Sequence, residues 1–306
     1  MGEVIADLRP EPDNPRILKA DLGGSSYFGC IGAANAIRAG KFDTVGSFFI
    51  GNISNDHFGR IISHEMDKAG VNTGYARKTN NISMLALVEI RDGRNTFEFY
   101  GRQKPNTVEQ LLIEDLPQDY KEKERLYCFG SVITNVSPAR ETIEQYARQQ
   151  SQDGHVIYFD PNTRPTLVKD RDAYIARLVD YAGFVSVMRA SEEDMEWMFP
   201  GQNPVEAAQR FLKAGPEAFI VTHGGKGCTV LAHGGTKYVE TRDLGAITHT
   251  VGAGDNFNAG VLVALAARGL SSRASLKALD SVEKWAEIAH DANETALRHL
   301  LSINKV

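Results

Sequence analysis

The sequence has few cysteines, no long hydrophobic run and no excess of positive charge. Cys30, Cys128 and Cys228 stand far apart and form no CxxC pair, which argues against a disulfide framework or a structural zinc site. The longest apolar stretch, residues 259–267, is far shorter than the roughly 20 residues of a membrane-spanning helix. With 34 Lys and Arg against 39 Asp and Glu, the formal net charge is -5, which argues against gripping nucleic acid as the main role.

The first residues, MGEVIADLRPEPDN, also lack a targeting pattern. They contain no basic segment followed by an apolar core, and position 6 is not Ser or Thr, so neither a signal peptide nor myristoylation is predicted. We therefore expect a cytoplasmic protein with no membrane partner and no nucleic acid partner. A chain of 306 residues with 42% hydrophobic residues forms one large domain or two ordinary ones, because single cores stop growing near roughly 250–300 residues.

Short apolar runs alternate with stretches of helical periodicity through most of the chain. The runs predict buried strands at residues 45–50, 126–131, 156–159, 185–187 and 218–222. Between them, the apolar spacing and the flanking Gly and Pro residues predict helices at residues 57–69, 138–150 and 204–214. This alternation predicts an α/β fold with a mostly parallel central sheet and helices on both faces.

Two segments interrupt this alternation. Residues 7–22 are polar and contain Pro10, Pro12 and Pro15, and residues 83–100 alternate apolar and polar side chains around a turn at 91–94, a β-hairpin pattern. We expect both segments to form a small β lid over the carboxyl edge of the sheet, where open α/β sheets bind ligands. The lid is assigned to about residues 8–22 and 74–102, within a single α/β domain over residues 1–306.

The most informative stretch is residues 248–269, THTVGAGDNFNAGVLVALAARG. Gly252 and Gly254 permit a tight turn, and apolar residues at helical spacing follow Asp255, so GAGD stands at a helix N-terminus. Free N–H groups and the positive end of the helix dipole favour an anion there. A carboxylate beside such a site suits phosphoryl transfer to an alcohol, with Asp255 as base. The plain alternative is that Asp255 only caps the helix.

Other nucleotide-binding patterns are missing. The sequence holds no GxxxxGK(S/T) and no GxGxxG after a strand, so a P-loop enzyme and a dinucleotide oxidoreductase are disfavoured.

Residues 250–260, TVGAGDNFNAG, resemble the C-terminal signature of the PfkB-type carbohydrate kinases, which have the ribokinase-like fold. Further matches follow in the family's order, at residues 2–7, Gly23-Gly24, 51–59, 97–102, 159–165 (FDPNTRP), 191–194 and 222–227. The form of residues 159–165 is most similar to bacterial fructokinases. The resemblance implies a three-layer α/β fold with a β lid, and an ATP- and Mg²⁺-dependent sugar kinase.

The resemblance also implies a role for each matched residue. Asp255 would remove the proton of the sugar hydroxyl, while the backbone amides of Gly252, Ala253 and Gly254 stabilise charge on the phosphates. Asp194 would help to hold Mg²⁺. The sugar would contact Asp7, Gly23, Gly24, Asn35, Arg102 and Asp160. The nucleotide site would include Asn162, Thr222, Gly224, Gly227 and Asn293.

The sequence departs from the family pattern at three positions. His249 stands where the family usually has the Asp of a monovalent-cation site, which puts potassium activation in doubt. Asp194 is shorter than the usual Glu. The family's sugar-contacting Asn corresponds to Phe28 when counted forward from Gly24, and to Asn35 when counted back from Gly51, and we expect Asn35 to lie near the sugar.

The sequence allows alternatives for the sugar acceptor, for the catalytic role and for the oligomeric state. 2-Keto-3-deoxygluconate, ribose or a modified sugar are alternatives to fructose. Outside the enzymes, the alternative is a non-catalytic regulator that binds sugar or nucleotide; the three departures favour it and the retained Asp255 argues against it. Lid strands in this family often pair between subunits, so the resemblance also raises a homodimer through the lid.

Overall fold

The computed structural model describes residues 1–11, 13–91, 94–100, 110–117, 125–245, 247 and 249–304. The strands are β1 (Ile5–Glu11), β2 (Asn14–Gly23), β3 (Gly51–Ser54), β4 (Ala76–Thr79), β5 (Met84–Arg91), β6 (Arg94–Tyr100), β7 (Leu126–Gly130), β8 (Val156–Asp160), β9 (Val187–Ser191), β10 (Ala218–Thr222), β11 (Gly227–Ala232) and β12 (Gly235–Glu240). The α-helices are α1 (Ser25–Gly40), α2 (His57–Ala69), α3 (Ala139–Gln152), α4 (Arg171–Ala182), α5 (Glu192–Met198), α6 (Pro204–Leu212), α7 (Ala253–Ala267), α8 (Arg273–Leu276) and α9 (Val282–Asn304).

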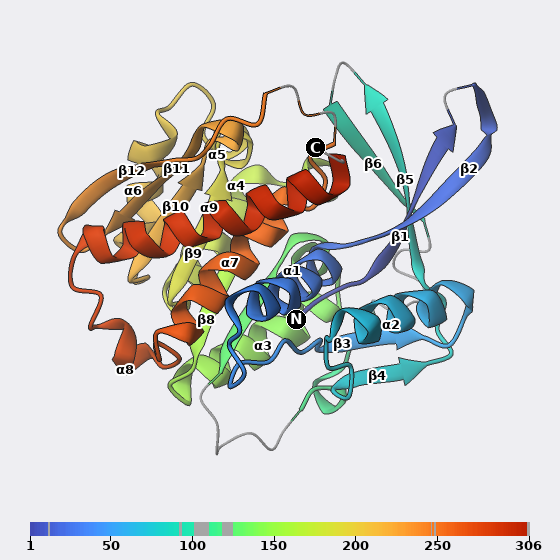
Figure 1. Cartoon of the computed structure of the whole chain (residues 1–306), viewed down its shortest axis with the longest axis horizontal. Helices are drawn as coiled ribbons and strands as arrows, with labels where there is room; N and C mark the ends of the chain where they lie inside the picture. The colour runs from blue at the N-terminus through green and yellow to red at the C-terminus, as the bar shows by residue number, and fades with distance from the viewer. Residues whose placement is uncertain are drawn as a thin grey trace.

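The central sheet has six strands in the order β12-β11-β10-β9-β8-β7 (Figure 1). Strands β7 to β10 pair in parallel, and β11 and β12 extend the sheet antiparallel. The predicted mostly parallel sheet is therefore confirmed. Its predicted strands at 126–131, 156–159 and 218–222 correspond to β7, β8 and β10, whereas the run at 185–187 ends where β9 begins.

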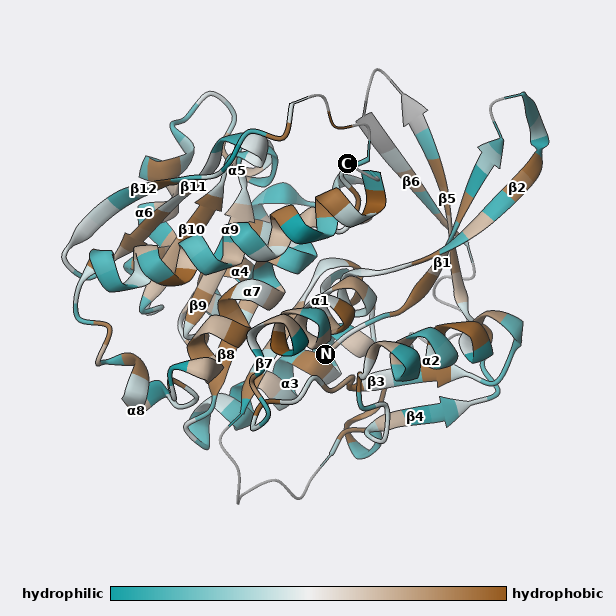
Figure 2. Ribbon diagram, viewed as in Figure 1, coloured by the Kyte–Doolittle hydropathy of each residue, from teal (hydrophilic) through white to brown (hydrophobic). Residues whose placement is uncertain are grey.

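Successive side chains of the central strands pack against opposite helix layers, as the period of two in a strand requires. In β8, Ile157 and Phe159 join the core formed with α3, α4 and α6, whereas Val156 and Tyr158 join the core formed with α7 and α9. The inner strands accordingly carry hydrophobic residues along their length (Figure 2). This two-sided burial produces the three layers and presents the carboxyl ends of β8, β9 and β10 at one edge.

The segments predicted to form a lid belong to a separate four-stranded sheet in the order β2-β1-β5-β6, which projects from the body in Figure 1 and is called the lid sheet below. The hairpin predicted within residues 83–100 is confirmed by antiparallel β5 and β6, and residues 14–23 pair back on β1 as a second hairpin. The predicted lid range also includes β4, which pairs with β3 in a sheet of its own.

The bounds of one predicted strand are wrong. Residues 45–50 contain only an isolated bridge from Phe48 to Asn72, and regular pairing starts at Gly51 in β3. The prediction of burial is confirmed for Phe49 and Ile50 but is wrong for Phe48, which is 44% exposed. A buried extended segment and a paired strand have the same apolar pattern, so the sequence could not distinguish them. Among the described helices, none is long and apolar enough to cross a membrane.

Candidate active site

The first turn of α7 begins at a glycine that no other residue could replace without strain. Gly252 has φ +80°, and a Cβ atom there would lie 2.9 Å from the ring of Phe28 and 3.0 Å from Nε2 of His299. The N–H of Ala253 donates to the carbonyl of Thr250 at 3.1 Å, so this predicted donor is already engaged. The next amides, at Gly254 and Asp255, have no acceptor within the helix, which makes this turn suited to an anion.

Asp255 is joined to two other side chains from distant parts of the chain. The hydroxyl of Ser25, the first residue of α1, donates to Oδ1 of Asp255 at 2.7 Å, and Nδ2 of Asn162 donates to the Ser25 Oγ at 2.7 Å. Burial raises the pKa of Asp255 to about 6; the Ser25 hydrogen bond opposes this rise and the Asp160 charge adds to it. A carboxylate with this pKa is ionised at neutral pH and still accepts a proton readily.

Asp160 ends β8 with a buried carboxylate, and both of its oxygens accept hydrogen bonds. Its Oδ1 accepts the N–H of Asn162 at 3.0 Å, and its Oδ2 accepts Nδ2 of Asn258 at 2.7 Å and Nη1 of Arg189 at 2.8 Å. A second nitrogen of Arg189 donates to the hydroxyl of Thr222 at the end of β10. Hydrogen bonds therefore connect the carboxyl ends of neighbouring strands to Asn162 and, through Ser25, to Asp255.

Asp7 lies in β1, against the double glycine that precedes α1. It is 3% exposed, and its Oδ1 has no hydrogen-bond partner within the described residues. Burial raises its pKa to about 6, opposed by the charge of Arg9. A Cβ atom at Gly23 would lie 2.3 Å from its Oδ2, so that glycine is needed for close approach, and Gly24 caps α1 with φ +97°. A carboxylate with an unused oxygen here suits the hydroxyls of a sugar.

Arg164 connects the turn after β8 with the lid. Its Nη1 donates to the carbonyl of Asn162 at 2.9 Å, and its guanidinium lies 5.3 Å from the ring centroid of Phe97 in β6. Its charge opposes the rise that burial causes in the pKa values of Asp255 and Asp7. It also opposes the rise at Glu3, whose pKa burial raises to about 7.

Asp194 has a structural use that the sequence did not predict. Its Oδ1 accepts the N–H of Thr163 at 2.7 Å, and its Oδ2 accepts the N–H and the hydroxyl of Ser191 at 2.9 and 2.6 Å. Both oxygens thus hold the turn after β8 against the start of α5. Its role in holding Mg²⁺ stays a prediction without structural support.

The described side chains offer few ligands for a magnesium ion. Within the described ranges, no three His, Cys, Asp or Glu side chains group as metal ligands. Mg²⁺ binds nucleotide phosphates while keeping several waters. The residues therefore do not fit a metal cage built by the protein, and any metal would be held mainly by the nucleotide.

Of the predicted nucleotide residues, Asn162 lies in the turn after β8 beside Ser25, whereas the others lie further along the same sheet edge. Gly224 and Gly227 enclose a short turn between β10 and β11, and a Cβ atom at Gly227 would lie 2.2 Å from the carbonyl of Val239. Asn293 is buried on α9, and its Nδ2 donates to the carbonyl of Glu240 at the end of β12 at 3.3 Å. Contact of any of these residues with a nucleotide stays a prediction.

One predicted sugar contact, Asn35, is not brought to the site. Asn35 is exposed in the middle of α1, where its Oδ1 accepts from Arg38 at 3.4 Å, because the helix already starts at Ser25 and turns position 35 outward. Phe28, the other candidate position, packs edge-on against His299, with centroids 6.0 Å apart. Arg102 lies outside the described residues. The backbone of His249 bonds the side chain of Asn304, from the end of α9.

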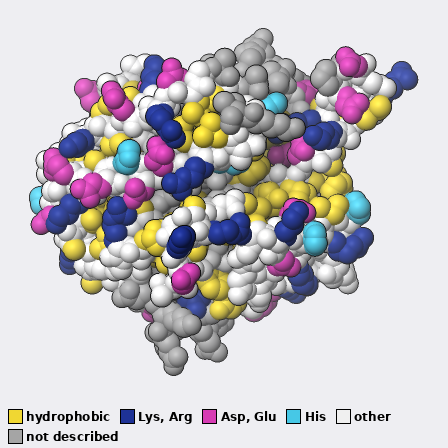
Figure 3. Space-filling view, viewed as in Figure 1, with side chains coloured by type: hydrophobic (Ala, Val, Ile, Leu, Met, Phe, Trp, Pro, Cys, Tyr) yellow, Lys and Arg dark blue, Asp and Glu magenta, His cyan; other side chains and the backbone are white. Residues whose placement is uncertain are grey.

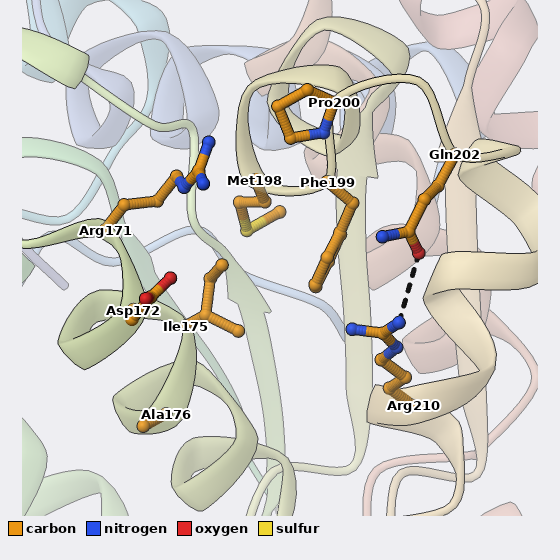
Figure 4. A pocket seen from close by; sticks show the side chains of 9 residues that line it. All are labelled: Arg171, Asp172, Ile175, Ala176, Met198, Phe199, Pro200, Gln202 and Arg210. Carbon is orange, nitrogen blue, oxygen red and sulfur yellow. Dashed lines mark hydrogen bonds between the residues drawn. The ribbon is translucent and has the colours of Figure 1, made fainter.

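Two hollows are visible in the described structure. One, of about 530 Å³, is bordered by Asp255, Asp160 and Ser25 and continues between α1, α7 and the edge of β7. The other, of about 590 Å³, lies between α4 and α6 and contains none of the predicted residues (Figure 4). The surface carrying α1 and α9 has interspersed acidic and basic side chains (Figure 3). Of these two hollows, only the first is lined by predicted site residues, namely Asp255 and Asp160.

Two side chains in this network were missed in the sequence. Ser25 follows the double glycine at a helix start, a position where a hydroxyl is common, so its signal was weak. Arg189 had a stronger signal, because it is a charged residue within the apolar run VSVMRA. Such a residue in a buried strand requires a partner.

Comparison with known proteins gives a consistent result. The family model for pfkB family carbohydrate kinases matches residues 14–290. A fructokinase of Rhizobium leguminosarum bv. trifolii is 27% identical over 279 residues, which are 91% of this chain and 82% of that protein.

Solved structures show the same fold. The fructokinase of Vibrio cholerae O395 in its fructose, ADP and calcium ion bound form superposes with a TM-score of 0.79 at 20% identity, covering 95% of this chain and 88% of that one. The aminoimidazole riboside kinase of Salmonella enterica, complexed with aminoimidazole riboside and an ATP analog, gives 0.75 at 22% identity, covering 96% and 89%.

The fold and the family match define a phosphotransferase that acts on a sugar hydroxyl. The chain belongs to the pfkB family of carbohydrate kinases and has their ribokinase-like fold.

Proposed function

We propose that the protein transfers the γ-phosphoryl group of ATP to a hydroxyl of a fructose-like sugar, with Asp255 as the general base. The observation that carries the proposal is the position of Asp255 in the first turn of α7, beside amides that have no helical acceptor. Its Oδ1 is held by Ser25, which leaves Oδ2 for a substrate hydroxyl. Fructose is the first acceptor to test because the similar proteins include fructokinases.

The reaction needs one proton transfer and one displacement at phosphorus. Asp255 takes the proton of the sugar hydroxyl as that oxygen forms a bond to the γ-phosphorus. The bond from the γ-phosphorus to the bridging β–γ oxygen breaks, and ADP leaves with that oxygen. The amides of Gly252 and Gly254 and the positive end of α7 stabilise the negative charge on the phosphoryl oxygens.

The remaining residues position the two substrates. The sugar is contacted by Asp7, Gly23, Gly24 and Asp160. Arg164, which lies beside Phe97, links these residues to the lid. The nucleotide is contacted by Asn162, Thr222, Gly224, Gly227 and Asn293, and its phosphates hold the Mg²⁺. Closure of the lid over the sugar excludes water, which otherwise competes as acceptor.

The test is sugar-dependent formation of ADP by the wild type, with fructose, ribose, 2-keto-3-deoxygluconate and aminoimidazole riboside as acceptors. The acceptor with the highest kcat/KM identifies the substrate class, and Asp255→Asn should abolish most of that turnover. Sugar binding by calorimetry without any product would instead favour the regulator and refute the kinase proposal.

Pairing of lids between subunits also stays a proposal. β2 is an edge strand of the lid sheet and exposes Ile17 and Leu18, at 49% and 45%. An unpaired strand edge with apolar side chains is suited to pair with a second copy. Sedimentation of the wild type beside Leu18→Lys would test this, since a dimer through the lid should dissociate in the variant.

A further inference from the structure

Arg189 is a charged residue in the middle of a buried strand. Its neighbours Met188 and Ala190 in β9 are fully buried, and Arg189 itself is 7% exposed. A guanidinium in such a place is costly unless it is paired and hydrogen-bonded. The proposed function gives it no role, so its presence in the strand needs its own explanation.

The guanidinium joins the two halves of the candidate site. Nη1 donates to Oδ2 of Asp160 at 2.8 Å. Asp160 accepts the N–H of Asn162, which is linked through Ser25 to Asp255, and we call this group the base side of the site. The other terminal nitrogen donates to Thr222, which belongs to the nucleotide side. The Nε atom is buried without a hydrogen-bond partner within the described chain. One planar cation therefore bridges the ends of β8 and β10 across the strand β9 that separates them.

The same guanidinium lies directly against the first turn of α7. A Cβ atom at Gly254 would stand 3.1 Å from Nη1 and 3.2 Å from Nη2. A real Cβ contact is rarely that short, so the glycine allows the cation to approach the backbone next to Asp255. A cation beside the positive end of a helix is unfavourable unless anions balance both. Asp160 supplies one negative charge, and bound phosphate would supply more.

We propose that Arg189 is a positioning residue for phosphoryl transfer, which holds the base side and the nucleotide side in register and adds positive charge next to the phosphate site. The inference rests on the proposed function. It concerns a residue that touches Asp160, Thr222 and Gly254 rather than the reacting atoms. Its loss should therefore reduce kcat more than it raises the KM for the sugar.

The experiment compares Arg189→Met and Arg189→Lys with the wild type, using the acceptor that gives the highest turnover. We expect kcat to fall about 100-fold in Arg189→Met, the loss expected when reacting groups are misplaced by about 1 Å. The KM for the sugar should change less than about threefold, because Arg189 touches no sugar-side residue but Asp160. Arg189→Lys keeps the positive charge but lacks the planar guanidinium, so its kcat should lie between those of Arg189→Met and the wild type.

A rescue measurement separates positioning from folding. Arg189→Met leaves Asp160 buried without its partner, so the variant could be unstable. The double variant Asp160→Asn/Arg189→Met replaces the pair by neutral groups and restores stability without restoring the cation. Guanidinium chloride at millimolar concentration should raise kcat in Arg189→Met and leave the wild type unchanged. Arg148→Met, which removes a partly exposed ion pair with Asp180, is the control.

The outcomes are distinguishable. Wild-type turnover that Asp255→Asn removes, together with a kcat in folded Arg189→Met within threefold of wild type, overturns this inference alone. An activity loss in Arg189→Met that follows its unfolded fraction, with no rescue by guanidinium, also overturns it. A wild type without sugar-dependent ADP formation overturns the proposed function and this inference together.

Discussion

Replacing Asp255 by Asn should stabilise the protein while removing its activity. The pKa of Asp255 lies at about 6 in the folded chain, against 3.8 for an ordinary Asp, chiefly because of burial. The folded state therefore holds the proton more tightly than the unfolded state. The stability that this group contributes is complete below about pH 3.8 and is lost as the pH rises through about 6.

The size of the effect follows from that difference. A shift of about two pKa units corresponds to about 3 kcal/mol between the protonated and the ionised forms. The neutral amide of Asn removes this penalty and can still accept the Ser25 hydroxyl. We expect Asp255→Asn to raise the free energy of unfolding by about 1–3 kcal/mol at pH 7 and to leave it unchanged near pH 4.

The activity should move in the opposite direction. Loss of a general base reduces kcat by about 100- to 10,000-fold. In the wild type, kcat/KM for the sugar should fall about tenfold for each pH unit below about 6.

Urea unfolding at pH 7 and pH 4, beside a coupled ADP assay from pH 5 to 8, measures both quantities. Asp172→Asn is the matched control, because Asp172 is an exposed acid in the first turn of α4.

Two results would refute the reasoning. A variant Asp255→Asn with kcat within tenfold of wild type shows that the carboxylate is not the base. A variant that is less stable than the wild type at pH 7 shows that the buried charge is not a net cost in the folded state.

The remaining predictions concern the groups around this carboxylate. Ser25→Ala removes the hydrogen bond that lowers the pKa of Asp255, so the acidic limb of the kcat/KM profile should move to higher pH, measured with the same assay. Gly252→Ala forces a φ of +80° on a residue with a Cβ and should lower the free energy of unfolding by about 1–3 kcal/mol in urea titration; an unchanged midpoint would contradict it. Asp194→Ala breaks three hydrogen bonds and should cost about 2–4 kcal/mol, with the Mg²⁺ dependence of turnover unaltered; a raised Mg²⁺ requirement would instead support a metal role. Asp7→Asn should raise the KM for the sugar at least about tenfold while the KM for ATP stays within threefold, as initial rates would show.

The sequence by itself determined the features that depend on neighbouring residues. The apolar spacing with the terminal glycine predicted α2, and the alternation around a turn predicted the β5–β6 hairpin, because period and capping are local properties. The same kind of signal placed Asp255 in the first turn of a helix. Along residues 45–50, the apolar pattern indicated the burial of Phe49 and Ile50 but not the exposure of Phe48 or the lack of regular strand pairing.

Only the tertiary structure decided which side chains meet. Ser25 and Asp255 are 230 positions apart in the sequence, and Ser25 and Asn162 are 137 apart, so no local pattern reports their contact. Folding also used both oxygens of Asp194 on backbone donors and turned Asn35 to the surface. Parallel strands bring the ends of β8, β9 and β10 to one edge, and this geometry, rather than any motif, places Arg189 between Asp160 and Thr222 beneath the first turn of α7.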